Sequence, residues 1–170
     1  MSSRRTFLSR ATKATAIAAA LPLVDCGMSQ ERSSAPASSA ASSSSAAQEG
    51  PEPQHIQVQH VLVGFKGSVP GKPIIRSQEE ARTLAYDILK KAQGGADFDG
   101  LVRQYTDDSP PGIYGMSNRG AQPAQGEYAR DGMVPAFGNV GFTLKVGGYG
   151  VADFDPRTSP YGYHVIKRLK

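Results

Sequence analysis

The sequence has very little cysteine and no long apolar run. Cys26 is the single cysteine among 170 residues, so neither an internal disulfide framework nor a site of several thiolates is expected. No apolar run reaches the roughly 18 residues that a membrane span needs, which argues against a polytopic membrane protein. The 19 basic and 15 acidic residues give a net charge of +4 without a basic stripe, so we expect no nucleic-acid partner.

Large apolar side chains are also missing from residues 29–54. This stretch has no Val, Ile, Leu, Met, Phe, Trp or Tyr, and Ser and Ala fill most of its first two thirds. Such a segment cannot bury enough surface to offset the entropy of ordering it. Residues 26–54 are therefore predicted to be a disordered linker that is dispensable for folding, and residues 55–170 to form one domain.

Residues 1–25 have the pattern of an export signal. Arg4 and Arg5 precede Phe7 and Leu8, as in the twin-arginine export motif that this segment resembles, and a mildly apolar, alanine-rich stretch follows. A short amphipathic helix with an accidental arginine pair is the alternative. We expect an exported protein, located in the periplasm or anchored to a membrane.

Cys26 stands where a lipoprotein signal would place its lipidated cysteine. The preceding residues resemble a lipoprotein box, although Asp25 occupies a position where a small residue is usual. Ordinary cleavage within residues 35–37 is the alternative. We expect lipidation of Cys26, and contact with a membrane only through this anchor.

Alternation of apolar residues marks a strand at the start of the folded part. One predicted face carries Ile56, Val58, His60 and Leu62, and the other carries Val61, Val63 and Phe65. Both faces become apolar toward residue 65, which favours a central strand. Similar patterns predict strands within residues 146–154 and 163–169.

Helical spacing and capping residues predict helices between these strands. Ser77 and Glu80 form a capping box at the start of a helix that Gly94 ends. Asp97 can cap a second helix. The order of elements predicts a small α+β domain whose antiparallel sheet is flanked by helices.

The remaining segments carry weaker signals. Residues 133–144 suggest another short helix, although two glycines and a proline interrupt them. Residues 106–115 are rich in turn-forming residues, and residues 121–132 lack any periodicity. Both of the latter are predicted to be turns or exposed loops.

Four stretches of the folded part together resemble the parvulin family of peptidyl-prolyl isomerases. They are residues 59–63, the helix around Glu80, residues 98–109 and residues 159–166. Each motif is weak alone, but their order and spacing are specific. The resemblance implies a parvulin-like fold over residues 55–170 and cis–trans isomerisation of Xaa-Pro bonds without a cofactor. It also implies unfolded or proline-containing polypeptides as substrates, and we expect a monomer.

The resemblance implies a catalytic floor and a pocket for the proline ring. His60 and His164 match the two histidines of the floor, and Asp108 matches the residue that faces them. The implied pocket residues are Met133, Phe137 and Phe142, together with Tyr114 in place of the family's pocket leucine and Tyr161 at a position where some members place serine.

Plainer interpretations of the same residues stay open at this point. The two histidines could be hydrogen-bonded core residues, the Met and Phe positions could be simple core, and Asp108 could close a helix. No spacing indicates a metal site. A domain that holds unfolded chains with little isomerase turnover is the main functional alternative.

The leader generates the first prediction. Changing Arg4 and Arg5 to lysine should keep a fused reporter in the cytoplasm, because twin-arginine export depends on the arginine pair. Changing Cys26 to alanine should release the exported protein from the membrane fraction. Fractionation of cells that carry each variant measures both effects. Export of the double-lysine variant would contradict the twin-arginine interpretation.

Overall fold

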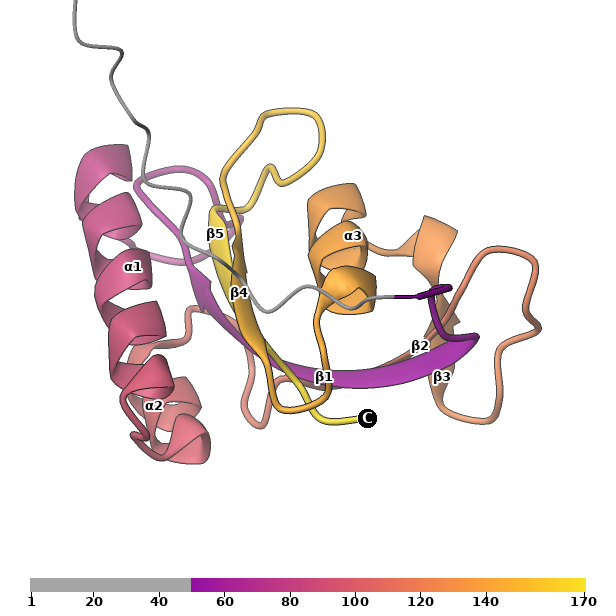
Figure 1. The fold of residues 1–170 in the computed structure, drawn as a ribbon. Coiled ribbons are helices and arrows are strands. Elements are labelled where there is room, and N and C mark those ends of the chain that lie inside the picture. Colours follow the sequence, from indigo (N-terminus) through magenta and orange to yellow (C-terminus); the bar gives the residue numbers. More distant parts are fainter. Residues whose placement is uncertain (1–49) are drawn as a thin grey trace, which may run out of the picture. The chain divides into compact units, whose positions relative to one another are not determined.

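Five strands form one sheet that carries helices on both faces (Figure 1). The computed structural model describes residues 50–170. The predicted export signal, Cys26 and most of the predicted linker lie outside the described residues. In chain order the elements are β1 (His55–Val63), α1 (Gln78–Gln93), α2 (Phe98–Tyr105), β2 (Ile113–Ser117), β3 (Glu127–Ala129), the 3-10 turn η1 (Arg130–Gly132), α3 (Pro135–Thr143), β4 (Tyr149–Ala152) and β5 (Tyr163–Arg168).

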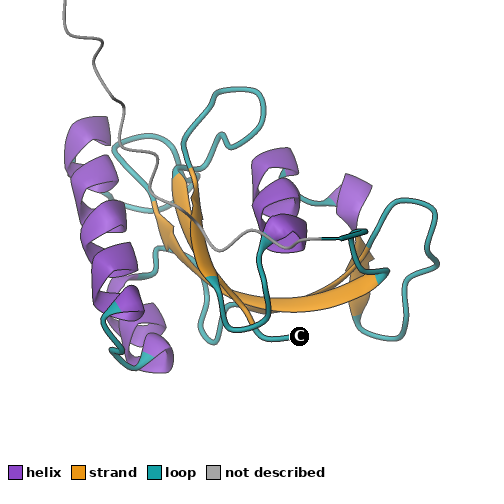
Figure 2. Ribbon diagram, viewed as in Figure 1, coloured by secondary structure: helices purple, strands orange, loops and turns teal. Residues whose placement is uncertain are grey.

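β1 is the central strand, as its apolar pattern predicts. The strand order is β3-β2-β1-β5-β4, so β1 has a hydrogen-bonded neighbour on each side. Val61 and Val63 point toward α1 and α2, whereas Ile56 and Val58 pack with α3. Helices thus cover both faces of β1 (Figure 2), which explains why its buried residues do not follow a simple in-and-out alternation.

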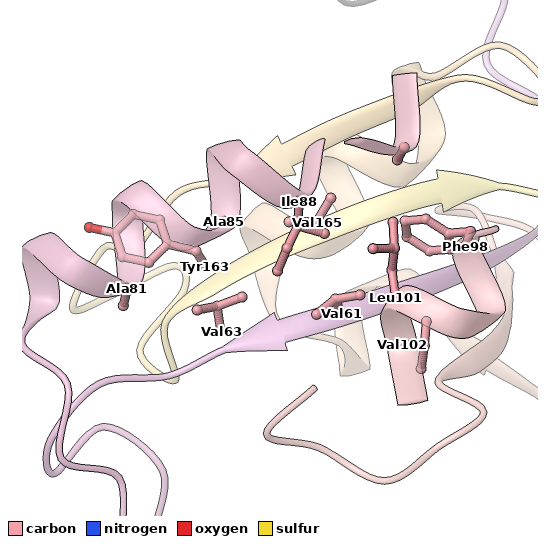
Figure 3. Packing of buried hydrophobic residues seen from close by; sticks show 11 residues of the cluster. Val61, Val63, Ala81, Ala85, Ile88, Phe98, Leu101, Val102, Tyr163 and Val165 are labelled. Atoms are coloured by element: carbon pink, nitrogen blue, oxygen red, sulfur yellow. The ribbon is translucent and has the colours of Figure 1, made fainter. Parts of the chain in front are cut away.

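α1 covers one face of the sheet through small side chains. The predicted capping box is confirmed: Ser77 accepts a hydrogen bond from the Glu80 backbone, and the Glu80 side chain accepts one from the Ser77 backbone. Ala81 and Ala85 are fully buried and let α1 approach the strands closely, while Ile88 packs near Val165 of β5 (Figure 3). The short α2 begins after Asp97, which caps it as predicted.

The α+β class is confirmed, but the sheet is mixed rather than wholly antiparallel. β3 pairs with β2 in parallel, and every other neighbouring pair is antiparallel. The first three residues of β2 and all of β3 lie in segments that the sequence predicts to be turns or loops. In β2, Gly115 lets the side chain of Glu127 of β3 pack closely against the backbone. Hydrogen bonds to β1 define β2 as a strand, because its own residues do not alternate between apolar and polar.

The folded part begins earlier than residue 55. The Asn118 backbone donates to the carbonyl of Gln54 at 2.7 Å, and the Asn118 side chain donates to the carbonyl of Pro53 at 3.0 Å. The Glu52 carboxylate accepts a hydrogen bond from Arg130 at 2.6 Å. Residues 52–54, which the apolar pattern assigns to the linker, are therefore part of the domain, because backbone and charge contacts hold them without any apolar side chain.

Arg130 explains why this short segment is bound. Its side chain is 6% exposed and lies over the ring of Phe142 at 4.6 Å. It also donates to the side chains of Asn118 and Asn139, each at 2.9 Å. A buried guanidinium needs a counter-charge, and Glu52 supplies it.

Among residues 50–170, no helix combines the length and the hydropathy that crossing a bilayer would require.

The Arg130 pair generates the second prediction. Glu52→Gln should lower the free energy of unfolding by about 1–3 kcal/mol, because it leaves a buried charge without its partner. Urea unfolding at neutral pH measures this loss. Asp131→Asn is the matched control, since it breaks the ion pair with Arg119 at 2.8 Å in which both side chains are exposed. The control should cost at most about 0.5 kcal/mol.

A shortened chain tests the same boundary. A chain that begins at Gly50 should be as stable as the full chain, whereas one that begins at Gln54 should lose the stability that Glu52→Gln loses. Equal stability of both shortened chains would show that residues 50–53 add nothing to the fold.

Candidate active site

Two buried histidines lie side by side on the face of the sheet that α3 covers. His60 is on β1 and His164 on β5; they are diagonal neighbours, because His164 pairs with Leu62 and His60 pairs with Ile166. Their Nδ1 atoms are 3.2 Å apart, and their rings are close to parallel, with centroids 5.3 Å apart. The structure therefore brings the two histidines into contact, and their catalytic role stays a prediction.

The turn after α2 is fastened to β1 and brings Asp108 to the histidines. Thr106 accepts a hydrogen bond from the backbone of Leu62, and the Asp107 backbone donates to the Leu62 carbonyl. Asp108 follows, and its Oδ2 lies 3.2 Å from Nε2 of His60. The hydroxyl of Tyr114 donates to the same oxygen at 3.1 Å. A connected polar chain therefore runs from Tyr114 through Asp108 and His60 to His164.

The ionised state of Asp108 sets the protons of this chain. Hydrogen bonding from His60 holds the pKa of Asp108 far below its ordinary value, with further help from the Ser109 backbone and Tyr114. A carboxylate can only accept, so Nε2 of His60 carries a proton and donates it. When His60 is neutral, its Nδ1 accepts from Nδ1 of His164, and Nε2 of His164 carries no proton.

Burial decides the protonation of His164 and Tyr114, the two ends of this hydrogen-bonded series. It lowers the pKa of His164 to about 3, and the neighbouring His60 adds to this effect. Nε2 of His164 is buried and has no hydrogen-bond partner among the described residues. Burial, together with the charge of Asp108, raises the pKa of Tyr114 to about 12, so its hydroxyl stays a donor. At neutral pH, His164 is neutral and Tyr114 is protonated.

A pocket of about 270 Å³ opens above the histidines. Its lining residues are His60, Leu62, Val69, Pro70, Asp108, Tyr114, Met133, Val134, Phe137, Tyr161 and His164. The structure thus brings together seven of the eight predicted catalytic and pocket residues. The ring of Phe137 stands edge-on to both histidines, with centroid distances of 5.1 Å and 5.5 Å, and joins the wall to the floor.

Phe142 is the predicted pocket residue that lies elsewhere. It is fully buried beneath Arg130 and packs into the core between α3 and the sheet. It lies five positions after Phe137, which turns the two side chains about 140° apart around the helix. Phe137 therefore faces the pocket, and the assignment of Phe142 to the pocket wall is wrong.

Four lining residues were not predicted. Leu62 could have been found, because it shares a strand face with His60 and lies two residues away. Val69 and Pro70 lie in the loop after β1, where no periodic pattern predicts which way the side chains point. Their position follows from Ser68, whose hydroxyl accepts from the Phe65 backbone and donates to the carbonyl of Tyr161, each at 2.9 Å. Val134 directly precedes α3, next to Met133.

Residues 50–170 contain no cluster of three or more His, Cys, Asp or Glu side chains placed to hold a metal ion. The site consists of an apolar pocket, a histidine floor and one ionised carboxylate.

The fold and this site define a parvulin-type domain. Residues 38–170 match the family model of the PPIC-type PPIase domain, so the chain belongs to that family. Three curated relatives are similar in sequence. The foldase PrsA of Bacillus subtilis (strain 168) is 29% identical over 108 residues, 63% of this chain and 32% of the relative. The chaperone SurA of Pseudomonas fluorescens is 29% identical over 115 residues, 67% of this chain and 22% of the relative.

The third relative, PrsA of Pediococcus pentosaceus, is 32% identical over 105 residues, 62% of this chain and 33% of the relative. The chain thus spans a third or less of the length of these curated relatives. Among solved structures, the peptidyl-prolyl isomerase Ess1 from Candida albicans matches with a TM-score of 0.51 at 20% identity, over 69% of this chain and 63% of that one. This likeness supports the parvulin-like α+β fold.

The buried histidine generates the third prediction. The pKa of His164 is lowered in the folded state, so between about pH 6.5 and 3 the unfolded chain binds a proton at this position that the folded chain does not. His164 therefore makes stability fall as the pH drops through this window, by up to about 1.4 kcal/mol per pH unit.

Chemical unfolding of the wild type and of His164→Asn at pH 5.0 to 7.0 isolates this effect, because the carboxylates with lowered pKa values act below this range. The variant is expected to be less stable at pH 7 but to lose less stability on acidification. An unchanged slope would mean that His164 is charged in the folded protein.

Proposed function

We propose that this domain is a peptidyl-prolyl cis–trans isomerase that assists the folding of exported polypeptides. The observation that carries the proposal is the apolar pocket over the His60–His164 pair, with the ionised Asp108 at its side. The matching PPIC-type PPIase family and the relatives named foldase and chaperone support it.

The pocket suits the side chain that such a reaction must hold. Rotation about an Xaa-Pro bond has a barrier of about 20 kcal/mol and takes tens to hundreds of seconds without catalysis. A catalyst must bind the twisted amide more tightly than either planar form. Met133, Val134 and Phe137 offer apolar contacts to a prolyl ring, so that the rest of the peptide can rotate while the ring stays fixed.

The polar floor favours the twisted amide over the planar amide. A planar amide is strongly dipolar, and its oxygen loses negative charge as the bond twists. The carboxylate of Asp108 and the apolar walls both disfavour the negative oxygen of the planar form. His60 holds this carboxylate in place, and the neutral His164 supports His60 without adding charge to the floor.

Export is the second part of the proposal. The leader resembles a twin-arginine signal, and Cys26 stands in a lipoprotein-like context. A tethered isomerase joined to a Ser- and Ala-rich segment could reach polypeptides as they emerge from the membrane. We therefore place the domain outside the cytoplasm, in the periplasm or on a membrane through Cys26.

A binding module with little turnover is the second candidate. The position of Tyr114 favours it: the hydroxyl occupies the Asp108 oxygen that also binds His60, and the ring takes up space in the pocket wall. A module of this kind would slow aggregation of unfolded chains but leave proline-limited refolding unchanged. The refolding rate of a substrate protein with a non-native prolyl isomer therefore separates the two candidates.

The pocket generates the fourth prediction. Phe137→Ala removes ring contacts worth about 1.5–3 kcal/mol, so kcat/KM for proline peptides should fall by at least tenfold. Asp108→Asn should lower kcat more than it raises KM, because the carboxylate acts mainly on the twisted amide. Both effects can be measured by exchange spectroscopy on short Xaa-Pro peptides.

Stability measurements distinguish these effects from misfolding. His60→Ala and His164→Ala should lower both activity and the thermal midpoint, since each leaves a buried hydrogen-bonding group unpaired. Phe154→Ala is the matched control for Phe137→Ala: it removes an equal side chain that packs on the α1 side of the sheet, and it should keep kcat/KM. Full activity of Asp108→Asn on every peptide would remove Asp108 from the mechanism.

A further inference from the structure

Asp108 is the one acidic residue among those that line the pocket. Neither lysine nor arginine is among its eleven lining residues. His164 is neutral there and Tyr114 is protonated, because burial shifts both groups in that direction. His60 is buried and directs its Nε2 toward Asp108 rather than to solvent. Asp108 therefore dominates the charge that a bound peptide meets.

The carboxylate of Asp108 is accessible to a ligand. Its side chain is 34% exposed, whereas that of His60 is 4% exposed. The two side chains that donate to it, His60 and Tyr114, both use Oδ2. A cationic group at the rim of the pocket can therefore approach Asp108 without displacing either donor.

The cations of the neighbouring loop do not offset this charge. Arg76 donates to Asp107 and to the carbonyl of Gly64, so its charge is engaged at the base of the loop. Lys66 and Lys72 of the same loop are exposed to solvent and do not line the pocket. An acidic residue beside the substrate proline would thus face the carboxylate of Asp108, and no lysine or arginine of the lining would pair with it.

We propose that the site prefers polypeptides in which a lysine or arginine directly flanks the proline. The inference rests on the proposed function and names the substrate class of the same pocket. A prolyl ring among Met133, Val134 and Phe137 leaves its neighbouring side chains at the rim. Two unit charges that approach within several ångströms at a partly exposed site change binding severalfold.

Matched peptides test the preference. In one series the residue before proline is Lys, Gln or Glu, and in a second series the residue after it is varied in the same way. We expect kcat/KM to follow Lys > Gln > Glu in at least one series, with about a fivefold difference between Lys and Glu that shrinks at high salt. Equal rates in both series, or a preference for Glu, would overturn the proposal.

A designed cation tests the cause. Tyr161 is 42% exposed and lines the pocket, so Tyr161→Lys adds a positive charge at the rim. The ratio of Lys to Glu peptides should fall toward one or below it. Val146→Lys adds the same charge at an exposed residue outside the pocket, and it should keep the wild-type ratio. A loss of the ratio in both variants would assign the preference to overall charge and overturn the role of Asp108.

Binding measurements separate this proposal from the proposed function. If no peptide is isomerised, the function fails, and the preference is then read from dissociation constants of the same peptides determined by fluorescence anisotropy. Tighter binding of the Lys peptides, reduced by Asp108→Asn, would support the preference in a non-catalytic module. Equal binding of the Lys and Glu peptides would overturn it.

Discussion

The hydrogen bond between His60 and His164 is the contact on which the arrangement of the site depends. It joins β1 to β5 at the centre of the sheet, and Phe137 of α3 packs edge-on against both rings. Two polar rings can be buried here only because each finds a partner. The pair therefore fixes the height of the pocket floor and the position of the apolar wall that stands on it.

Asp108 completes this arrangement from a different part of the chain. Thr106 and Asp107 hold the turn after α2 against β1, so the carboxylate of Asp108 reaches His60. The result is a site with a deep apolar part and one ionised edge. The loop that contains Val69 also lines the pocket, and the hydroxyl of Ser68 holds this loop to the carbonyl of Tyr161.

Local patterns in the sequence predict much of this structure. Alternation and capping residues predict the central strand, the capped α1 and the short α2. The resemblance implies eight site residues, of which seven line one pocket in the structure. β2 and β3 escape prediction because pairing with distant strands defines them. The assignment of Phe142 overlooks the helical spacing, because five positions turn two side chains about 140° apart. The role of Glu52 depends on Arg130, 78 residues away.

Nuclear magnetic resonance on a single sample tests the central claim most directly. A short labelled Xaa-Pro peptide is mixed with a catalytic amount of the isotope-labelled domain, and cis–trans exchange is measured together with the backbone shifts of the protein. The account predicts exchange faster than the uncatalysed rate, with shift changes concentrated around His60, Asp108 and Phe137. Exchange at the uncatalysed rate, or shift changes confined to a surface away from this pocket, would contradict it.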